Sequence, residues 1–186
     1  TIMELESDTW NVVWEWLAWE HGFDEGENPE TNEPHILTRS RSKAESLEEQ
    51  GEKVLLVNNP RKNPIPTAMR AAFINSAEYD HHGNIIATLF HHGKVLQIDR
   101  NTFKQQELIT GLAKPHGGQQ LAKGYLVTDT AGGRVVIQED QRYSNYNFHK
   151  LPGKNEELGQ LEWLQTSHYT ENMIVTIDSN RHAFVT

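Results

Sequence analysis

Residues 115–140 read PHGGQQLAKGYLVTDTAGGRVVIQED, and the fold is decided by the pattern within this stretch. After the Pro-His-Gly comes an alternating strand pattern with YLVTDT as its core, and an Asp-Thr-Ala-Gly-Gly-Arg turn then leads into a second strand. Runs of about six residues bounded by glycine, asparagine and aspartate turns are typical of antiparallel β-strands. The stretch therefore predicts a β-hairpin, with a further strand after the Pro-His-Gly that opens it.

The same pattern occurs three times, in residues 74–99, 115–140 and 163–186. The central runs IIATLF, YLVTDT and MIVTID align so that Ile86, Leu126 and Ile174 are equivalent. Each central run is preceded by one strand-like run and is followed by a turn and then a third strand-like run. A fourth strand fits at 102–109 and at 146–151. The offsets between equivalent residues are 40 and 48, and four antiparallel strands that recur at such a spacing are the sequence signature of a β-propeller blade.

We therefore predict an all-β fold, a β-propeller of four-stranded antiparallel blades with about three to four blades present. Residues 73–186 are assigned to three consecutive blades, at 73–111, 112–160 and 161–186, the last of them incomplete. The shared hairpin register predicts the innermost strands, each followed by an antiparallel neighbour. These are Asn75–Tyr79, Gly117–Leu121 and Trp163–Ser167.

Residues 1–72 are assigned to a preceding blade that carries a short helical insertion. Tryptophans alternate along WNVVWEWL, which is typical of a strand with an aromatic face. Ser42 and Glu45 have the spacing of a capping box, which favours a helix start. The expected elements are a strand at 10–17, an acidic loop at 20–33, a helix that ends at Gly51, a strand at 53–57 and a proline-rich connector at 58–66.

The composition excludes several classes of function. The 186 residues contain 17 basic and 26 acidic side chains, so the net charge of −9 argues against a nucleic-acid partner. Because the chain has no cysteine, it has neither disulfides nor a zinc–thiolate site. No apolar run is long enough to span a bilayer. We expect no cofactor and no membrane partner, while the composition does not indicate a compartment.

Two propeller families resemble this chain in particular residues. YLVTDTAGGRVVI (125–137) and MIVTIDSNRHAFV (173–185) resemble the NHL-type blade, in which a strand ends in Asp before a small-residue turn and an apolar strand. VVWEW (12–16) together with residues 74–103 is similar to bacterial arylsulfotransferase-like propellers, which combine a Trp-rich strand with an "Ile-Asp-x-x-Thr" strand end. The resemblance implies a six-bladed ring and, as a possible activity, sulfuryl transfer. That family places a histidine before Asn75, where this chain has Phe73 and Ile74.

Two pairs of histidines, His81-His82 and His91-His92, invite interpretation as a metal site. Both pairs are predicted to lie in turns at opposite ends of the strand at 84–90. Seven residues of strand separate the pairs by roughly 20 Å, whereas Zn–N bonds are about 2 Å long. The pairs therefore do not share a metal, and we predict no metal site.

His116 is the strongest candidate for a ligand contact. Counting back eight residues from the turn glycines places His116 in register with Asn75, and the third repeat offers Leu164 and its neighbour Gln165. A ring of Asn75, His116 and Gln165 would present polar groups at the mouth of a propeller channel, where ligands bind. The alternative is a Pro-His-Gly turn whose imidazole bonds to a backbone carbonyl group.

Other charged and aromatic groups have structural interpretations. Asp129 with Arg134 and Asp178 with Arg181 each span one hairpin turn, where such a pair fixes the turn geometry. The tryptophans of residues 10–19 are assigned to packing between blades. The acidic stretch at 20–33 lacks the oxygen spacing of a calcium loop.

Two functions follow as hypotheses. The first is a binding propeller that holds a small molecule or a protein at the channel mouth. The second is an arylsulfotransferase-like enzyme that transfers a sulfuryl group between aromatic acceptors, with His116 as the reacting group. Transfer of an anionic group needs cationic assistance, so a second His or Arg beside His116 would favour the enzyme. The candidates for that role are His149 and Arg70.

Three blades and a fragment would leave apolar blade faces uncovered. We therefore expect the chain not to be a closed monomer. Either the rest of a longer chain or copies in a homo-oligomer would complete the ring.

Overall fold

The computed structural model describes residues 1–186 except 29–30, 39, 57–71, 171–172, 182 and 186. The chain divides into two compact units, Thr1–Phe73 and Ile74–Thr186. Strand accounts for 48% and helix for 9%, so the fold is all-β, and no sheet closes on itself among the described strands. In the same residues, no helix combines the length and apolar character needed to cross a membrane.

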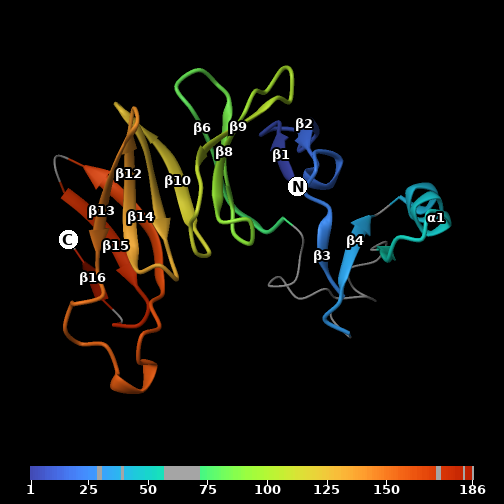
Figure 1. Ribbon diagram of the computed structural model, residues 1–186. Helices are drawn as coiled ribbons and strands as arrows, with labels where there is room; N and C mark the ends of the chain where they lie inside the picture. The colour runs from blue at the N-terminus through green and yellow to red at the C-terminus, as the bar shows by residue number, and fades with distance from the viewer. Residues whose placement is uncertain (29–30, 39, 57–71, 171–172, 182, 186) are drawn as a thin grey trace. The chain divides into compact units, whose positions relative to one another are not determined.

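Three antiparallel sheets make up the second unit, in sequence order (Figure 1). The first contains β6 (Ile74–Tyr79), β7 (Ile85–Leu89), β8 (Lys94–Ile98) and β9 (Gln105–Ile109). The second contains β10 (His116–Leu121), β11 (Gly124–Asp129), β12 (Arg134–Glu139) and β13 (Arg142–Asn147). The third contains β14 (Leu164–Thr170), β15 (Met173–Asp178) and β16 (Ala183–Val185).

The three predicted first strands are confirmed as β6, β10 and β14, and each pairs antiparallel with the strand that follows it. The fourth strands were less accurately predicted. In the second sheet the strand is β13 rather than 146–151, and all six of its residues are exposed. Without a buried face, β13 has no apolar alternation by which its position could be recognised.

The middle hairpins of the three sheets share one register. The last residues of β7, β11 and β15 each pair with the first residue of the next strand: Leu89 with Lys94, Asp129 with Arg134 and Asp178 with Ala183. The expected alignment of the central runs matches Thr88, Thr128 and Thr176, and all three are fully buried. In the third sheet one additional residue, Ile177, lies between this threonine and the end of the strand. The hairpin that follows is therefore displaced by one position from the expected alignment.

Two clusters of buried apolar side chains join neighbouring sheets. One cluster joins the first and second sheets and contains Ile86, Val95, Ile109, Leu112, Val127 and Val136. The other joins the second and third and contains Leu126, Val135, Ile137, Phe148 and Leu164. Consecutive residues of β11, Leu126 and Val127, enter different clusters because side chains alternate across a strand. The two middle strands of the second sheet, β11 and β12, are therefore covered on both faces.

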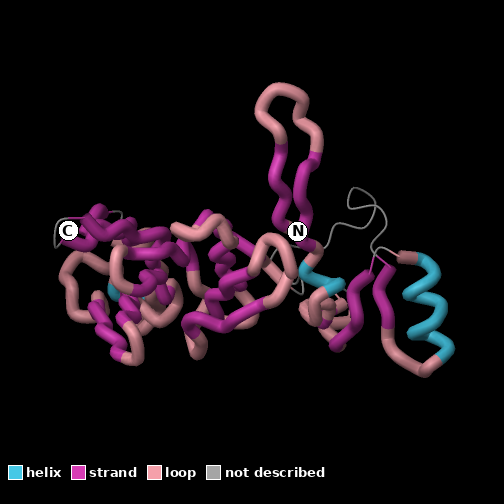
Figure 2. Tube along the Cα trace, turned by 90° about the horizontal axis from the view of Figure 1, so that it is seen from above, coloured by secondary structure: helices cyan, strands magenta, loops and turns pink. Residues whose placement is uncertain are grey.

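The first unit contains a hairpin and a small mixed sheet (Figure 2). The hairpin pairs β1 (Ile2–Leu5) with β2 (Val12–Trp16), and the short 3-10 helix Ala18–Glu20 follows. The sheet contains β3 (Glu25–Glu27), β4 (Pro34–Thr38) and β5 (Val54–Leu56), and α1 (Arg41–Glu49) connects the last two. β4 and β5 are parallel, as a helical crossover between them allows.

Two local expectations for this unit need correction. The helix cap is Ser40 rather than Ser42, because the Ser40 hydroxyl accepts a hydrogen bond of 3.2 Å from the Lys43 backbone N–H. The acidic stretch at 20–33 is not wholly a loop, since β3 lies within it and pairs with β4. The expected connector at 58–66 lies outside the described residues, as does the last residue of the strand expected at 53–57.

Candidate functional site

A β-bulge lies near the start of the first strand of every sheet in the second unit. The pairing shifts between Ile74 and Ser76 in β6, between His116 and Gln119 in β10, and between Leu164 and Ser167 in β14. Bulges leave a residue out of the ladder and redirect its side chain, and they are common next to binding sites. Asn75, His116 and Gln165, the three residues expected to line the site, lie at these bulges.

Two of these three side chains make equivalent hydrogen bonds. The His116 Nδ1 atom lies 2.7 Å from the Thr130 hydroxyl, and Gln165 Nε2 donates to the Ser179 hydroxyl at 3.2 Å. Thr130 and Ser179 each follow the buried aspartate that ends the second strand of its sheet. The contact is therefore a repeated feature, and it supports placing His116 and Gln165 in one register.

Asn75 makes a different contact, which links the first sheet to the second. Its Nδ2 atom donates to the carbonyl oxygen of Pro115 at 2.8 Å, directly before His116. The Asn75 Oδ1 atom is buried and has no hydrogen-bond partner among the residues that the structure describes. The structure thus connects Asn75 with the His116 turn, while the contacts of Gln165 lie within the third sheet.

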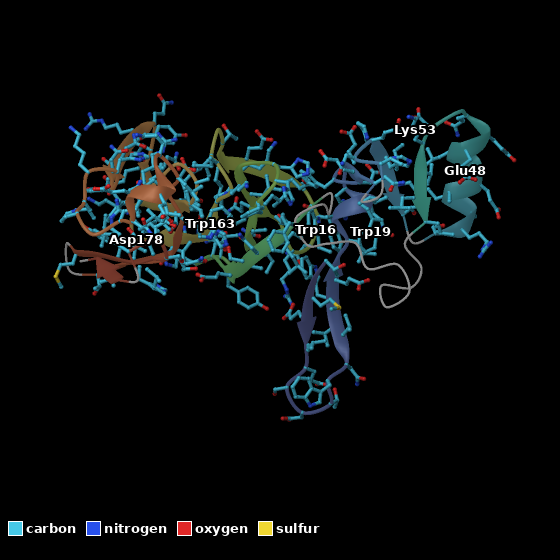
Figure 3. All side chains as sticks on the ribbon, turned by 90° about the horizontal axis from the view of Figure 1, so that it is seen from below. Trp16, Trp19, Glu48, Lys53, Trp163 and Asp178 are labelled. Carbon is cyan, nitrogen blue, oxygen red and sulfur yellow. The ribbon has the colours of Figure 1, made fainter. Side chains whose placement is uncertain are left out.

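His116 contacts an aromatic ring of the first sheet, which in turn contacts one that precedes the third sheet. The Phe90 ring, at the end of β7, meets the imidazole edge-on with 5.4 Å between ring centroids, and it meets the Trp163 ring at 6.3 Å. The Lys114 Nζ atom lies 5.3 Å from the centroid of the Trp163 ring, within the range of a cation–π contact. All three sheets therefore contribute to one cluster, and Figure 3 marks the position of Trp163 in it.

The environment of His116 favours its neutral form. Burial lowers the pKa of the imidazole below its usual value of 6.5, although a hydrogen bond from the ring to the Lys114 carbonyl oxygen acts in the opposite direction. The imidazole hydrogen-bonds both to a backbone carbonyl, as expected for a structural turn, and to the Thr130 side chain. At pH 7 it is a neutral group that can donate from one nitrogen and accept at the other.

The histidine pairs flank β7, as the sequence indicates, and they lie in its two turns. The turn before β7 is organised by Asp80, whose Oδ1 atom accepts hydrogen bonds from the backbone of His82 and Asn84. In the part of the chain that the structure describes, no three His, Asp or Glu side chains form a group that could hold a metal ion.

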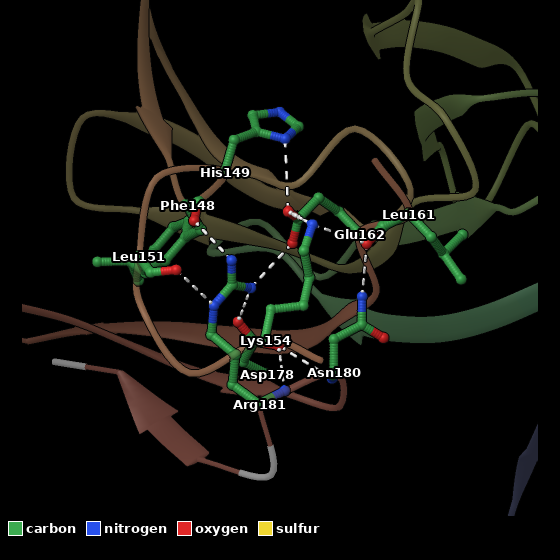
Figure 4. A network of polar contacts seen from close by, with 9 residues as sticks. All are labelled: Phe148, His149, Leu151, Lys154, Leu161, Glu162, Asp178, Asn180 and Arg181. Atoms are coloured by element: carbon green, nitrogen blue, oxygen red, sulfur yellow. Dashed lines mark hydrogen bonds and ion pairs between the residues drawn. The ribbon is translucent and has the colours of Figure 1, made fainter. Parts of the chain in front are cut away.

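A buried charge network fills the connection between β13 and β14 (Figure 4). Glu162, with a side-chain exposure of 0%, accepts hydrogen bonds from Lys154 Nζ at 2.7 Å and from Arg181 at 2.9 Å. Arg181 also pairs with Asp178 at 2.6 Å and donates to the carbonyl oxygens of Phe148 and Leu151. The negative charges of the two acids balance the positive charges of the two bases, and these contacts connect the loop to the third sheet.

The network shifts the pKa values of its members. Burial raises the pKa of Glu162, but the hydrogen bonds and charges of Arg181 and Lys154 outweigh it and hold the pKa below its usual value of 4.5. The hydrogen bond to Glu162 raises the pKa of Arg181. Both groups are therefore charged at neutral pH, and the network is structural in character.

The predicted hairpin ion pairs are both present. Arg134 contacts Asp129 at 2.7 Å and Arg181 contacts Asp178 at 2.6 Å. Asp129 also accepts a 2.6 Å hydrogen bond from the backbone N–H of Ala113, which joins the first two sheets. Of the two residues considered as helpers for His116, His149 has its Nδ1 atom 3.6 Å from Glu162 instead, and Arg70 is outside the described residues.

Sequence reasoning missed most of the groups that accompany His116. Phe90, Thr130 and Trp163 each lie at a strand end or just outside a strand, where no periodic pattern marks them. Counting from the first-strand bulge to the end of the second strand would have found Thr130.

An open cavity of about 590 Å³, which the sequence did not indicate, lies beside the charge network. Its lining includes Lys154, Asn155, Leu158, Ser179 and Asn180.

The tryptophans of the first unit do not form one stripe. Trp16 is fully buried and stacks on His21 at 5.4 Å and against Phe23 at 6.0 Å. Trp10 is 75% exposed.

Neither protein-family models nor curated proteins provide a match to this chain.

Proposed function

We propose that the second unit consists of consecutive blades of a β-propeller and that it binds a ligand where the first strands begin. The order of strands, the shared hairpin register and the repeated bulges support this architecture. β10 lies against β6 and β7, and β14 lies against β10 and β11, which is how inner strands of adjacent blades pack. The resemblance to NHL-type and arylsulfotransferase-like propellers agrees with this assignment.

One observation carries the binding proposal: three sheets direct Phe90, His116 and Trp163 into a single cluster at the bulged end. Aromatic surface with a few polar groups is the composition of small-molecule sites. The neutral imidazole and the Lys114 ammonium group provide hydrogen bonds and one positive charge. We therefore propose a small ligand that contains an aromatic ring and a hydrogen-bond acceptor.

Sulfuryl transfer is the alternative, and the contacts of His116 favour binding over it. The hydrogen-bonding partners of the imidazole are a threonine hydroxyl and a backbone carbonyl oxygen. Neither is cationic, whereas the transferred group and its leaving oxygen would need positive charge beside the reacting nitrogen. Lys114 lies over Trp163 rather than in a hydrogen bond with His116.

The proposal is tested by titrating the protein with benzoate, indole and indole-3-acetate while recording NMR spectra of the histidine side chains. We expect indole-3-acetate to bind most tightly and His116→Ala to weaken its binding at least tenfold. His81→Ala and His92→Ala, in the turns beside β7, serve as controls and should change the affinity less than twofold. Equal effects of the three substitutions would contradict a site at His116.

A second assay separates the two functions. The protein is incubated with 4-nitrophenyl sulfate and phenol, and release of nitrophenol is followed by absorbance. A binding protein leaves the aryl sulfate intact. Nitrophenol release that needs both phenol and His116 would establish the transfer reaction and overturn binding as the principal function.

A further inference from the structure

The hairpin of β1 and β2 has one covered side and one exposed apolar side. Ile2 pairs with Trp16, and both are buried. The exposed fractions on the rest of the hairpin are high for apolar side chains: Met3 54%, Leu5 44%, Val12 52% and Val13 57%. A two-stranded ribbon is marginally stable in water unless its apolar surface is covered. Contiguous exposed apolar surface of this kind marks interaction sites.

Trp10 projects from the turn of the same hairpin. Its side chain is 75% exposed, and its backbone φ is 60°, a left-handed conformation that residues other than glycine rarely adopt. Residues held in such conformations occur preferentially at functional sites. Tryptophan is also the residue most enriched among the energetic centres of protein interfaces. The turn thus presents a large anchor side chain at the cost of backbone strain.

The charge around the hairpin identifies the kind of partner. Residues 1–38 contain ten acidic residues and no lysine or arginine, whereas the other 148 residues contain 16 acidic and 17 basic ones. This segment therefore carries a net charge of −10 and the rest of the chain +1, which together give the chain's −9. Glu6, Asp8 and Glu15 are exposed on the hairpin itself. Complementary charge steers association and selects partners.

We propose that the β1–β2 hairpin is a docking surface for another protein that presents a basic and apolar contact surface. Met3, Leu5, Val12 and Val13 form the apolar part of the interface, and Trp10 is its anchor. The surrounding carboxylates pair with lysine or arginine of the partner. A second copy of this chain brings the same negative charge and is repelled, as is an anionic membrane surface.

The proposal is tested with the full-length chain and three fluorescent peptides of equal length. One alternates lysine with valine, one alternates lysine with serine, and one alternates glutamate with valine. We expect binding of the lysine–valine peptide, measured by fluorescence anisotropy, to be at least tenfold tighter than binding of either other peptide. Raising the salt from 0.05 to 0.5 M should weaken it, because screening shortens the range of the charges. Equal binding of all three peptides would overturn the proposal.

A pair of variants locates the binding site. Trp10→Gly removes the anchor and suits the left-handed backbone, so we expect at least tenfold weaker binding with no loss of thermal stability. Met173→Ser, on β15, removes an apolar side chain that is also 52% exposed and should change binding less than twofold. Unchanged binding by the Trp10 variant would overturn the assignment.

The other possible occupants give different results in two further measurements. Sedimentation of the free chain at 0.15 M salt should show no hairpin-dependent self-association, and vesicles of anionic lipid should not bind. A dimer that Trp10→Gly dissociates would replace the proposal by self-association. Vesicle binding that the same variant abolishes would replace it by a membrane surface.

Discussion

Glu162 has a fully buried carboxylate with three basic neighbours, Lys154, Arg181 and His149. Removing its charge leaves two buried cations with only Asp178 to compensate them. Because uncompensated buried charge is costly, we expect Glu162→Gln to lower the free energy of unfolding by about 3–5 kcal/mol, measured by urea denaturation. Glu157→Gln, at an exposed position in the same loop, is the control and should cost under about 0.5 kcal/mol.

The same carboxylate should make stability depend on pH. Its pKa in the folded protein lies below the usual 4.5, so the folded state binds fewer protons than the unfolded state as the pH falls. Its stabilising contribution is present above pH 4.5 and is lost as the pH falls through the folded pKa. The stability difference between the natural chain and Glu162→Gln should therefore shrink below pH 4.5 in urea titrations. A difference that stays constant down to pH 2.5 would contradict this assignment.

Spacing along the chain determined which residues of these sites were predictable. Asp178 and Arg181 are close together across one turn, so their ion pair follows from the sequence. Glu162 is distant from Arg181 along the chain and follows no strand, and only the folded loop brings them together. Counting along the repeats placed His116, Asn75 and Gln165 in one register. Phe90 follows β7 as Thr130 follows β11, and Trp163 precedes β14 as Phe73 precedes β6, but the residue types differ between the repeats, so no shared residue type marks these positions.

Among the elements, the turns before β8 and β12 end in glycines with positive φ that contact the next connection. Gly133 has φ of 59°, and a Cβ atom there would lie 2.6 Å from Glu162 Cγ and 2.9 Å from His149 Cε1. The carbonyl oxygen of Gly133 accepts a hydrogen bond from the backbone N–H of Phe148. The carbonyl oxygen of Gly93 accepts the equivalent hydrogen bond from the backbone N–H of Leu112. These glycines therefore fix the path of the chain after the fourth strand.

Gly133→Ala tests this role. We expect it to destabilise the protein by about 2–4 kcal/mol, because it combines backbone strain with a steric clash. Gly153→Ala is the control, because Gly153 also has a positive φ, 90°, but a Cβ atom there meets nothing within 4 Å. Only backbone strain remains, so we expect this variant to lower the free energy of unfolding by about 1 kcal/mol. Chemical denaturation compares the two variants. Equal costs would show that the clash is relieved by movement of the loop.

Strand positions were predictable to different degrees for physical reasons. β7, β11 and β12 are buried, so apolar content and turn residues mark them clearly. β13 is exposed throughout and carries no such signal. The parallel pairing of β4 with β5 depends on a contact between Ile36 and Val54 across the helix, which local patterns do not encode.

At the scale of the whole molecule, burial differs between the two units. Both intersheet clusters of buried apolar residues lie within Ile74–Thr186. The hairpin of the first unit has one ladder and a largely exposed outer side. Opening of a segment costs less free energy where fewer buried contacts are lost.

Hydrogen exchange should reveal this difference. We expect the backbone amides of β11 and β12 to exchange slowest and those of β1 and β2 at least a hundredfold faster, measured by mass spectrometry of the intact chain. Peptides from one protein sample serve as controls for one another. Equal protection of the hairpin and of β11 would mean that the two units open as one cooperative structure.

The bulges at the first strands have a consequence for how this molecule can change. Asn75 is left out of the ladder in β6, Gly117 and Gly118 in β10, and Gln165 and Thr166 in β14, whereas His116 pairs with Thr128 at the edge of its bulge. Each sheet thus carries one polar side chain, Asn75, His116 or Gln165, at an irregular position apart from the apolar layers that hold the sheets together. Substitutions at these three positions can therefore change the polar groups one at a time while the apolar layers stay the same.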